Sequence, residues 1–143
     1  MSKEIVTYTA GGLMKSLTGY MPASMDHETI TPVPLVRLSR ELQQKDVLAL
    51  VSIAIDYVIA NTNVSKSLTP AQNYEIASVI ITRYKFLTPA DIKKAMYIGL
   101  TGGYGEKNKI FDRVDMALII NWLDCYVEKQ QEDIEREHLE RKN

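Results

Sequence analysis

The chain has 143 residues, of which 45% are hydrophobic and 24% are charged, and its formal net charge at pH 7 is −1. These values are ordinary for one globular domain with a real core, and they exclude a chain that is basic overall. Cys125 is the only cysteine, which excludes an internal disulfide. The most apolar run, Val47 to Ile59, is too short to span a bilayer, and the first residues lack a signal-peptide core. We therefore expect a soluble, cytoplasmic protein without membrane contact.

The charge is unevenly distributed along the chain. Residues 83–113 hold seven basic and three acidic residues, a balance of +4, whereas residues 114–143 hold four basic and eight acidic residues, a balance of −4. This asymmetry indicates an interaction surface, although the two blocks could equally face each other in the fold or be solvated.

Residues 1–33 are interrupted by glycine and proline and show no lasting apolar period, so we expect a flexible N-terminal arm. Four of the six methionines lie in this segment. The alternative is an arm that docks on a partner through a short helix, with Leu13, Leu17 and Tyr20 on one face.

Helical periodicity begins at Pro34. The spacing of Leu35, Leu38 and Leu42 predicts a short amphipathic helix over residues 34–44. The proline suits the first turn of this helix, because the backbone N–H that it lacks would have no helical partner there.

A second helix is predicted over the apolar run from Val47 to near Ile59, with Asp46 as the cap at its start. Apolar side chains cover nearly all of its faces, which is typical of a helix buried in a core. A buried strand is the competing interpretation, because many of these residues are β-branched. The length of the run favours a helix.

The sequence Leu-Thr-Pro-Ala occurs twice, at residues 68–71 and 87–90. Each copy provides a threonine for the N-cap and a proline for the first helical position, and Gln72 or Asp91 follows at the third. Two further helix starts are therefore predicted.

The first of these two helices is expected to end near Lys85, with Tyr74 on the face toward the core. The second is expected to end near Leu100. Gly102 or Gly103 would end it, because glycine adopts the left-handed conformation at little cost.

The last helix is predicted to begin near Asp112 and to run almost to the end of the chain, with residues 128–143 as a charged, solvated helical tail. The sequence as a whole predicts an all-α protein. Its single small domain of about five helices covers residues 34–127, between the flexible arm (1–33) and the tail. The residues expected on the inward face of the last helix are Val114, Leu118, Ile119, Trp122, Leu123 and Tyr126.

The segment from Leu100 to Asp115 contains three glycines within four residues, and lysines follow them. A phosphate-binding P-loop places Gly-Lys-Ser/Thr between a strand and a helix. Here Glu106 separates the last glycine from Lys107, Asn108 stands where a hydroxyl residue is needed, and a helix precedes the segment. We therefore interpret it as a turn between helices and expect no nucleotide cofactor.

No motif for catalysis or metal binding is recognisable. The nitrogen and sulfur candidates for a metal site, His27, Cys125 and His138, stand far apart without ligand spacing. Carboxylates such as Asp115 and Asp124 fit helix caps and surface positions more simply than a catalytic pair. We expect no metal and no catalytic residue, and we predict that the protein is not an enzyme.

Direct binding of single-stranded nucleic acid is one hypothesis for the basic block. Its cations alternate with tyrosine and phenylalanine, a combination that binds phosphates and stacks on bases. The competing interpretation is a core with a lysine-rich rim, because Tyr84 and Tyr97 fit buried helix faces. The candidate nucleic-acid-binding residues are Arg83, Lys85, Lys93, Lys94 and Arg113.

The turn "GGYG" at residues 102–105 is followed by a helix that carries "WLDCY" at residues 122–126. This pattern, within the stretch from Tyr74 to Tyr126, resembles that of small helical proteins encoded by phages and other bacterial mobile elements. It is more distantly similar to the helical domains of phage helicase loaders. The resemblance implies a phage or mobile-element setting and a role in DNA replication. The chain departs from ATPase-type loaders because it has no nucleotide-binding motif.

Our leading hypothesis is a non-enzymatic adaptor that binds another macromolecule, with a protein such as a replicative helicase as its partner. Aromatic and basic residues in an exposed turn suit a protein interface, where aromatic anchors carry much of the binding energy. The alternatives are a nucleic-acid-binding protein, a virion component whose arm orders on assembly, and a homodimer closed by exposed aromatic residues. The candidate partner-binding residues are Tyr104, Lys107, Lys109 and Phe111.

Overall fold

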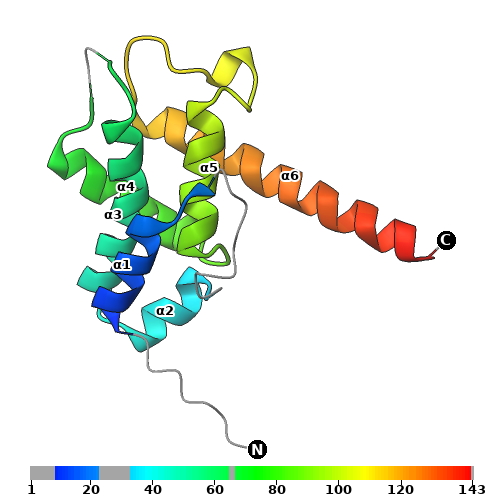
Figure 1. The fold of residues 1–143 in the computed structure, drawn as a ribbon, viewed down its shortest axis with the longest axis horizontal. Coiled ribbons are helices and arrows are strands. Elements are labelled where there is room, and N and C mark those ends of the chain that lie inside the picture. Colours follow the sequence, from blue (N-terminus) through cyan, green and yellow to red (C-terminus); the bar gives the residue numbers. More distant parts are fainter. Residues whose placement is uncertain (1–8, 23–32, 65–66, 143) are drawn as a thin grey trace, which may run out of the picture.

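The computed structural model describes residues 9–22, 33–64 and 67–142, and the regular elements in these ranges are all helices (Figure 1). The predicted all-α fold is confirmed, with six α-helices among the described residues in place of about five. The elements in chain order are α1 (Ala10–Gly19), α2 (Leu35–Glu41), α3 (Gln44–Ala60), α4 (Pro70–Arg83), α5 (Pro89–Leu100), the short 3₁₀ helix η2 (Glu106–Asn108) and α6 (Met116–Lys142).

Helix α3 forms the centre of the core. It packs against α1, α4 and α5, while α6 packs against α5 and α4 (Figure 1). Its apolar side chains are buried on several faces, as predicted for a core helix, and the strand alternative is excluded. Full burial of a Val, Leu or Ile side chain stabilises a fold by roughly 1.5–3 kcal/mol. The buried residues of α3 are Val47, Leu48, Leu50, Val51, Ala54, Ile55 and Val58.

Both Leu-Thr-Pro-Ala sequences start helices as predicted. Thr69 Oγ1 accepts a hydrogen bond from the backbone N–H of Gln72 (3.2 Å), and the Gln72 side chain accepts one from the Thr69 N–H (2.9 Å). Thr88 and Asp91 form the same reciprocal pair at the start of α5, at 3.0 and 3.1 Å. These bonds satisfy N–H groups that the start of a helix leaves without an intrahelical partner.

Two other helix starts differ from the prediction. Asp46 lies inside the first turn of α3 and does not cap it, although a carboxylate there is still favoured by the helix dipole. Helix α6 begins after the predicted position at Asp112. The reason is that Asp115 Oδ1 accepts a hydrogen bond from the Leu118 N–H (3.0 Å), so Asp115 is the residue that caps α6.

The N-terminal segment, expected as a flexible arm over residues 1–33, contains a packed helix in its described part. Helix α1 lies against α3, and the side chains of Leu17 and Tyr20 are 1% and 3% exposed. Burial of these two side chains explains the difference, because the apolar face that was considered for docking on a partner docks on the domain itself. The rest of the expected arm, residues 1–8 and 23–32, lies outside the described residues.

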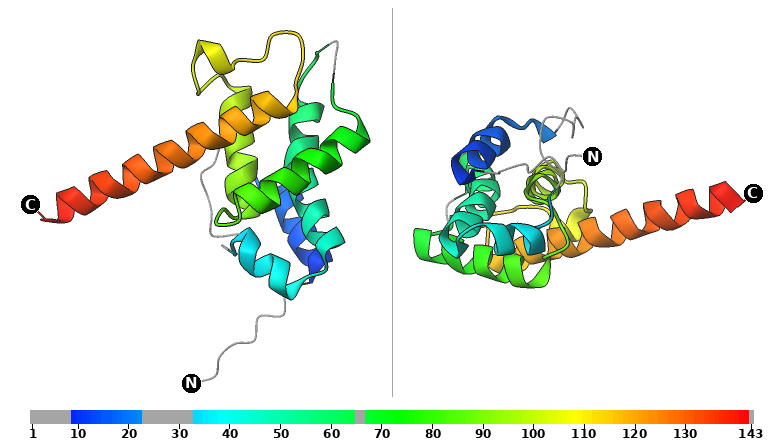
Figure 2. Two further views of the ribbon diagram at one scale, coloured as in Figure 1. Left: turned by 180° about the vertical axis from the view of Figure 1, so that it is seen from behind. Right: turned by 90° about the horizontal axis from the view of Figure 1, so that it is seen from below.

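Helix α6 has two different halves. The first half packs on the domain through buried residues that include Trp122, Leu123 and Tyr126. The second half leaves the body of the domain and carries the C-terminal end away from the other helices (Figure 2). Ile134 and Leu139 in this half are each 61% exposed. The second half thus has the form of the charged, solvated helix end that was predicted.

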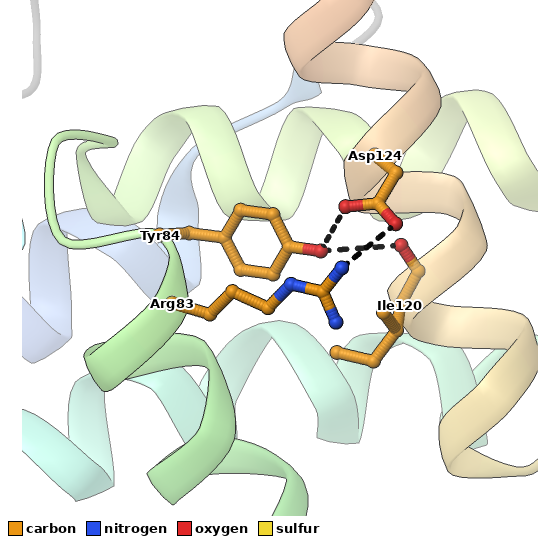
Figure 3. Close-up of polar contacts among 4 residues, drawn as sticks. All are labelled: Arg83, Tyr84, Ile120 and Asp124. Atoms are coloured by element: carbon orange, nitrogen blue, oxygen red, sulfur yellow. Dashed lines mark hydrogen bonds and ion pairs between the residues drawn. The ribbon is translucent and has the colours of Figure 1, made fainter.

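Polar contacts tie α6 to the end of α4 (Figure 3). The Tyr84 hydroxyl donates to the Asp124 carboxylate and also reaches the Ile120 carbonyl oxygen at 3.4 Å. Arg83 pairs with the same carboxylate at 3.3 Å and lies over the Tyr84 ring. Burial, and then the bond to Asp124, raise the pKa of the Tyr84 hydroxyl, which therefore remains a donor. These contacts fix the position of α6 on the domain.

Candidate functional site

The loop at residues 101–115 connects α5 to α6 and is a turn, as the sequence indicated. Gly102 and Gly105 have φ angles of +79° and +90°, in the left-handed region that glycine adopts without strain. A Cβ atom on Gly103 would lie 2.5 Å from the side chain of Ile98. The three glycines are therefore explained by the backbone geometry of the turn.

Trp122 of α6 holds this loop in place. Its indole Nε1 donates to the carbonyl oxygen of Asn108 at 2.7 Å, and the Asn108 side chain donates to the carbonyl oxygen of Tyr104 at 3.2 Å. The ring also packs on Gly99 of α5, where a Cβ atom would lie only 2.2 Å from it. Packing and hydrogen bonds together thus fix the loop relative to α5 and α6.

Tyr104 differs from its predicted role as an exposed contact residue. Its hydroxyl donates to the carbonyl oxygen of Ala95 at 3.0 Å, and its half-buried ring packs against the core. Burial raises the pKa of this hydroxyl, so it remains a protonated donor. Tyr104 therefore positions the loop and offers a partner little aromatic surface.

The other three predicted contact residues lie together. Lys107, Lys109 and Phe111 line an open hollow between the loop and the first turns of α6. Phe111 is 80% exposed, the highest value for a large hydrophobic side chain among the described residues. Leu118, which was expected to point inward, is half-buried and lines the same hollow. We call this surface the loop–α6 face; it consists of Lys107, Lys109, Phe111, Asp112, Arg113, Asp115, Ala117, Leu118 and Asn121.

The cations of the loop–α6 face are only weakly paired within the chain. Lys109 lies 2.6 Å from the Glu106 carboxylate, and Arg113 lies 3.6 Å from that of Asp115, with all four side chains substantially exposed. Exposed pairs of this kind contribute about 0–1 kcal/mol, so an external carboxylate can compete for these cations. Lys107 has no ion pair with any described residue.

Lys93, predicted as a nucleic-acid-binding residue, is inside the protein. It is 4% exposed, and its Nζ donates to the carbonyl oxygens of Leu17, Thr18 and Tyr20 at 2.9, 3.2 and 3.0 Å. Burial lowers the pKa of its ammonium group. This lysine therefore binds the end of α1 and is not available to a phosphate.

The remaining basic residues do not form one patch. Arg83 and Lys85 precede α5 in the chain, Lys94 is half-buried on α5, and Lys107, Lys109 and Arg113 follow it. Helix α5 has 12 residues, and at 1.5 Å per residue its two ends lie about 18 Å apart. The folded chain thus separates the basic residues before α5 from those after it, and of the basic block only Lys107, Lys109 and Arg113 contribute to the loop–α6 face.

The described residues give no sign of an activated nucleophile or a metal site. Cys125 is half-buried, and burial raises the pKa of its thiol, which keeps it protonated. No group of three or more His, Cys, Asp or Glu side chains in these ranges could hold a metal ion. His27 lies outside the described residues. In the same ranges, no helix combines the length and the apolar character that a membrane span requires.

One surface was not predicted from the sequence. A hollow between α3 and α4 is lined by Asp56, Asn73 and Tyr74, among others. Tyr74 was expected to face the core, but it is 58% exposed, because Asn73 and Ile76 take the buried positions of that turn. The sequence does hold one signal for this surface. Asp56 is the only charged residue in the apolar run from Val47 to Ile59, so it marks the side of α3 that faces solvent.

No protein-family model, curated protein or solved structure matches this chain. Its function is therefore inferred from its own residues and geometry.

Proposed function

We propose that the protein is a non-enzymatic helical adaptor that binds another protein through the loop–α6 face. The observation that supports this best is Phe111, a large apolar side chain that is 80% exposed on a loop that Trp122 and Tyr104 hold in place. A pre-positioned aromatic side chain binds at a lower entropic cost than a mobile one. Exposed aromatic residues of this kind often dominate binding energy.

The chemistry of the face defines the partner that fits it. Phe111 would enter an apolar pocket on the partner. The three cations of the face, Lys107, Lys109 and Arg113, outnumber its two carboxylates, Asp112 and Asp115, and would face carboxylates at the rim of that pocket. The resemblance to helical proteins of phages and mobile elements favours a partner in DNA replication. A replicative helicase in the host cytoplasm is the specific partner that we propose.

The experiment is an affinity capture from the native host or infected cell with the whole chain as bait. It compares the wild-type protein with Phe111→Ala and with Phe86→Ala, and each capture is repeated after nuclease treatment. Phe86 is a matched control, because it is 53% exposed but lies in the connection between α4 and α5, away from the face. The proposal predicts one dominant nuclease-resistant partner that Phe111→Ala loses and Phe86→Ala retains. Equal recovery by all three baits would overturn it.

Single-stranded nucleic acid is the second candidate ligand. The observation that favours it is the grouping of Lys107, Lys109 and Arg113 beside an exposed ring. Fluorescence anisotropy with a labelled oligonucleotide tests it. Binding through these three cations predicts an affinity that falls with salt, with a log–log slope of about −0.7 per contacted phosphate. Binding that does not change with salt, or no binding at low salt, would remove this candidate.

A further inference from the structure

A groove runs along the outer side of α3, where α4 flanks it. Two adjoining hollows form it, and they share Ser52 of α3 and Tyr74 of α4. One end is lined by Leu48, and the other by Asp56 and Asn73. We call this surface the α3–α4 groove. It contains no residue of the loop–α6 face, so an inference about it is independent of the proposed function.

The polar end of the groove holds an oriented carboxylate. The Asn73 side-chain N–H donates to Asp56 Oδ1 at 2.8 Å, which fixes the carboxylate against α4. Asp56 is exposed to solvent, and no cation of the described residues forms an ion pair with it. A fixed carboxylate without an internal cation is a favourable place for a positive group from outside.

Asn73 also has an acceptor without a partner. The residue is 9% exposed, and its Oδ1 is buried without a hydrogen bond from any described residue. A buried acceptor that is left without a donor costs the desolvation free energy of that group. Because this oxygen is buried, a ligand on the surface of the groove does not reach it, and the carboxylate that Asn73 orients is the group available to a ligand.

Tyr74 supplies the second component of the site. Its ring is 58% exposed at the point where the two hollows meet, next to the carboxylate end of the groove. An exposed tyrosine face attracts cations, and it stacks with planar cations better than with compact ones. This ring has no role in the core, because Ile76, Ala77 and Ile80 are the buried apolar residues of α4.

We propose that the α3–α4 groove is a binding site for an arginine side chain of a partner protein. The planar guanidinium pairs with the Asp56 carboxylate and stacks on the Tyr74 ring. An arginine meets both groups at once because its N–H donors form a rigid, planar fork. A lysine ammonium has the charge but lacks the plane and the fork.

The test is a nuclear magnetic resonance titration of the whole ¹⁵N-labelled chain with N-acetyl-L-arginine amide. The control ligand is N-acetyl-L-citrulline amide, which has nearly the same shape and no charge. The expected result is a saturable shift of the backbone signals of Ser52, Asp56, Asn73 and Tyr74 with the arginine derivative alone. No shift at these positions, or the same shift with both ligands, would overturn the proposal.

Variants make the assignment specific. Asp56→Asn and Tyr74→Ala should each weaken arginine binding, Asp56→Asn by about tenfold or more because it removes a charge-assisted bond. Both positions are exposed, so both variants should retain the wild-type spectrum elsewhere. Glu75→Gln is the matched control, since Glu75 is an exposed carboxylate beside Tyr74 that does not line the groove. Equal weakening by Glu75→Gln would show a non-specific charge effect and contradict the proposal.

Discussion

The ammonium group of Lys93 lies 2.9 Å from the carbonyl oxygen of Leu17, and the two residues are 76 positions apart in the sequence. With two further bonds, to the carbonyl oxygens of Thr18 and Tyr20, this lysine caps the C-terminal end of α1. Helix α1 contains three glycines in ten residues, and each glycine costs a helix about 1 kcal/mol relative to alanine. Contacts with the domain, and not its own propensity, therefore hold α1 in place.

Lys93→Met should release α1 from the domain. Methionine replaces the unbranched methylene chain of lysine with one of similar length, but it leaves three carbonyl oxygens without their donor. We therefore expect the free energy of unfolding to fall by about 1–3 kcal/mol. Amide hydrogen exchange should accelerate most in α1. Lys94→Met at the half-buried neighbouring position is the control, with an expected change of less than about 0.5 kcal/mol. Unchanged exchange in α1 would show that apolar packing alone holds the helix.

Two glycine-to-alanine changes should have opposite effects on stability. Gly99→Ala places a Cβ atom 2.2 Å from the Trp122 ring, and we expect this overpacking to cost about 1–3 kcal/mol. Gly11→Ala meets nothing within 4 Å, so the higher helix propensity of alanine should stabilise α1 by up to about 1 kcal/mol. Chemical denaturation measures both. If Gly99→Ala were stabilising, the close packing of α6 on α5 would be refuted.

The contact between α4 and α6 should depend more on Tyr84 than on Arg83. Tyr84→Phe removes a buried donor to Asp124 and should cost about 1 kcal/mol. Arg83→Ala removes an exposed ion pair with the same carboxylate and should cost less, between about 0 and 1 kcal/mol. Urea denaturation at low and high salt distinguishes the hydrogen bond of Tyr84 from the ion pair of Arg83. Salt screens only the ion pair, so only the effect of Arg83→Ala should shrink at high salt. A larger loss for Arg83→Ala would reverse this order.

Alkaline pH should destabilise the fold through its buried tyrosines. Burial raises the pKa of Tyr84, Tyr104 and Tyr126 above the ordinary value of 10.0. Above about pH 10 the unfolded chain therefore loses protons that the folded chain keeps, and stability falls as the pH rises. Below that pH the contribution is fully present. Each tyrosine should add a slope of up to roughly 1.4 kcal/mol per pH unit.

Denaturation curves at several alkaline pH values test this dependence, and phenolate absorbance shows when the tyrosines ionise. Tyr104→Phe should reduce the slope, because one of the shifted groups is removed. A stability that is constant from about pH 8 to pH 11 would contradict the burial of these hydroxyl groups.

Local signals in the sequence predicted the helices well. The two Leu-Thr-Pro-Ala copies gave α4 and α5 their correct first residues, because a capping box depends on residues that are close in the chain. The start of α6 was placed too early, since both Asp112 and Asp115 could cap a helix and only the backbone geometry distinguishes them.

The candidate sites depended on contacts between distant residues, and the sequence predicted them less well. Lys93 was predicted to belong to a basic surface, but its partners are carbonyl oxygens at the C-terminal end of α1, which no sequence pattern indicates. Tyr74 was placed inward by helical spacing, but the buried face of α4 begins at Asn73 and continues through Ala77 and Ile80, which leaves Tyr74 outside it. Lys107, Lys109 and Phe111 lie close together in the sequence and were found together in the structure.

Calorimetric titration measures whether Phe111 anchors a protein partner on the loop–α6 face, as we propose. The partner recovered by affinity capture would be titrated with the wild-type chain, with Phe111→Ala and with Phe86→Ala, after thermal unfolding has shown that both variants melt as the wild type does. We expect a loss of about 2 kcal/mol or more, roughly thirtyfold in affinity, for Phe111→Ala and almost none for Phe86→Ala. Equal affinities for all three chains would contradict it.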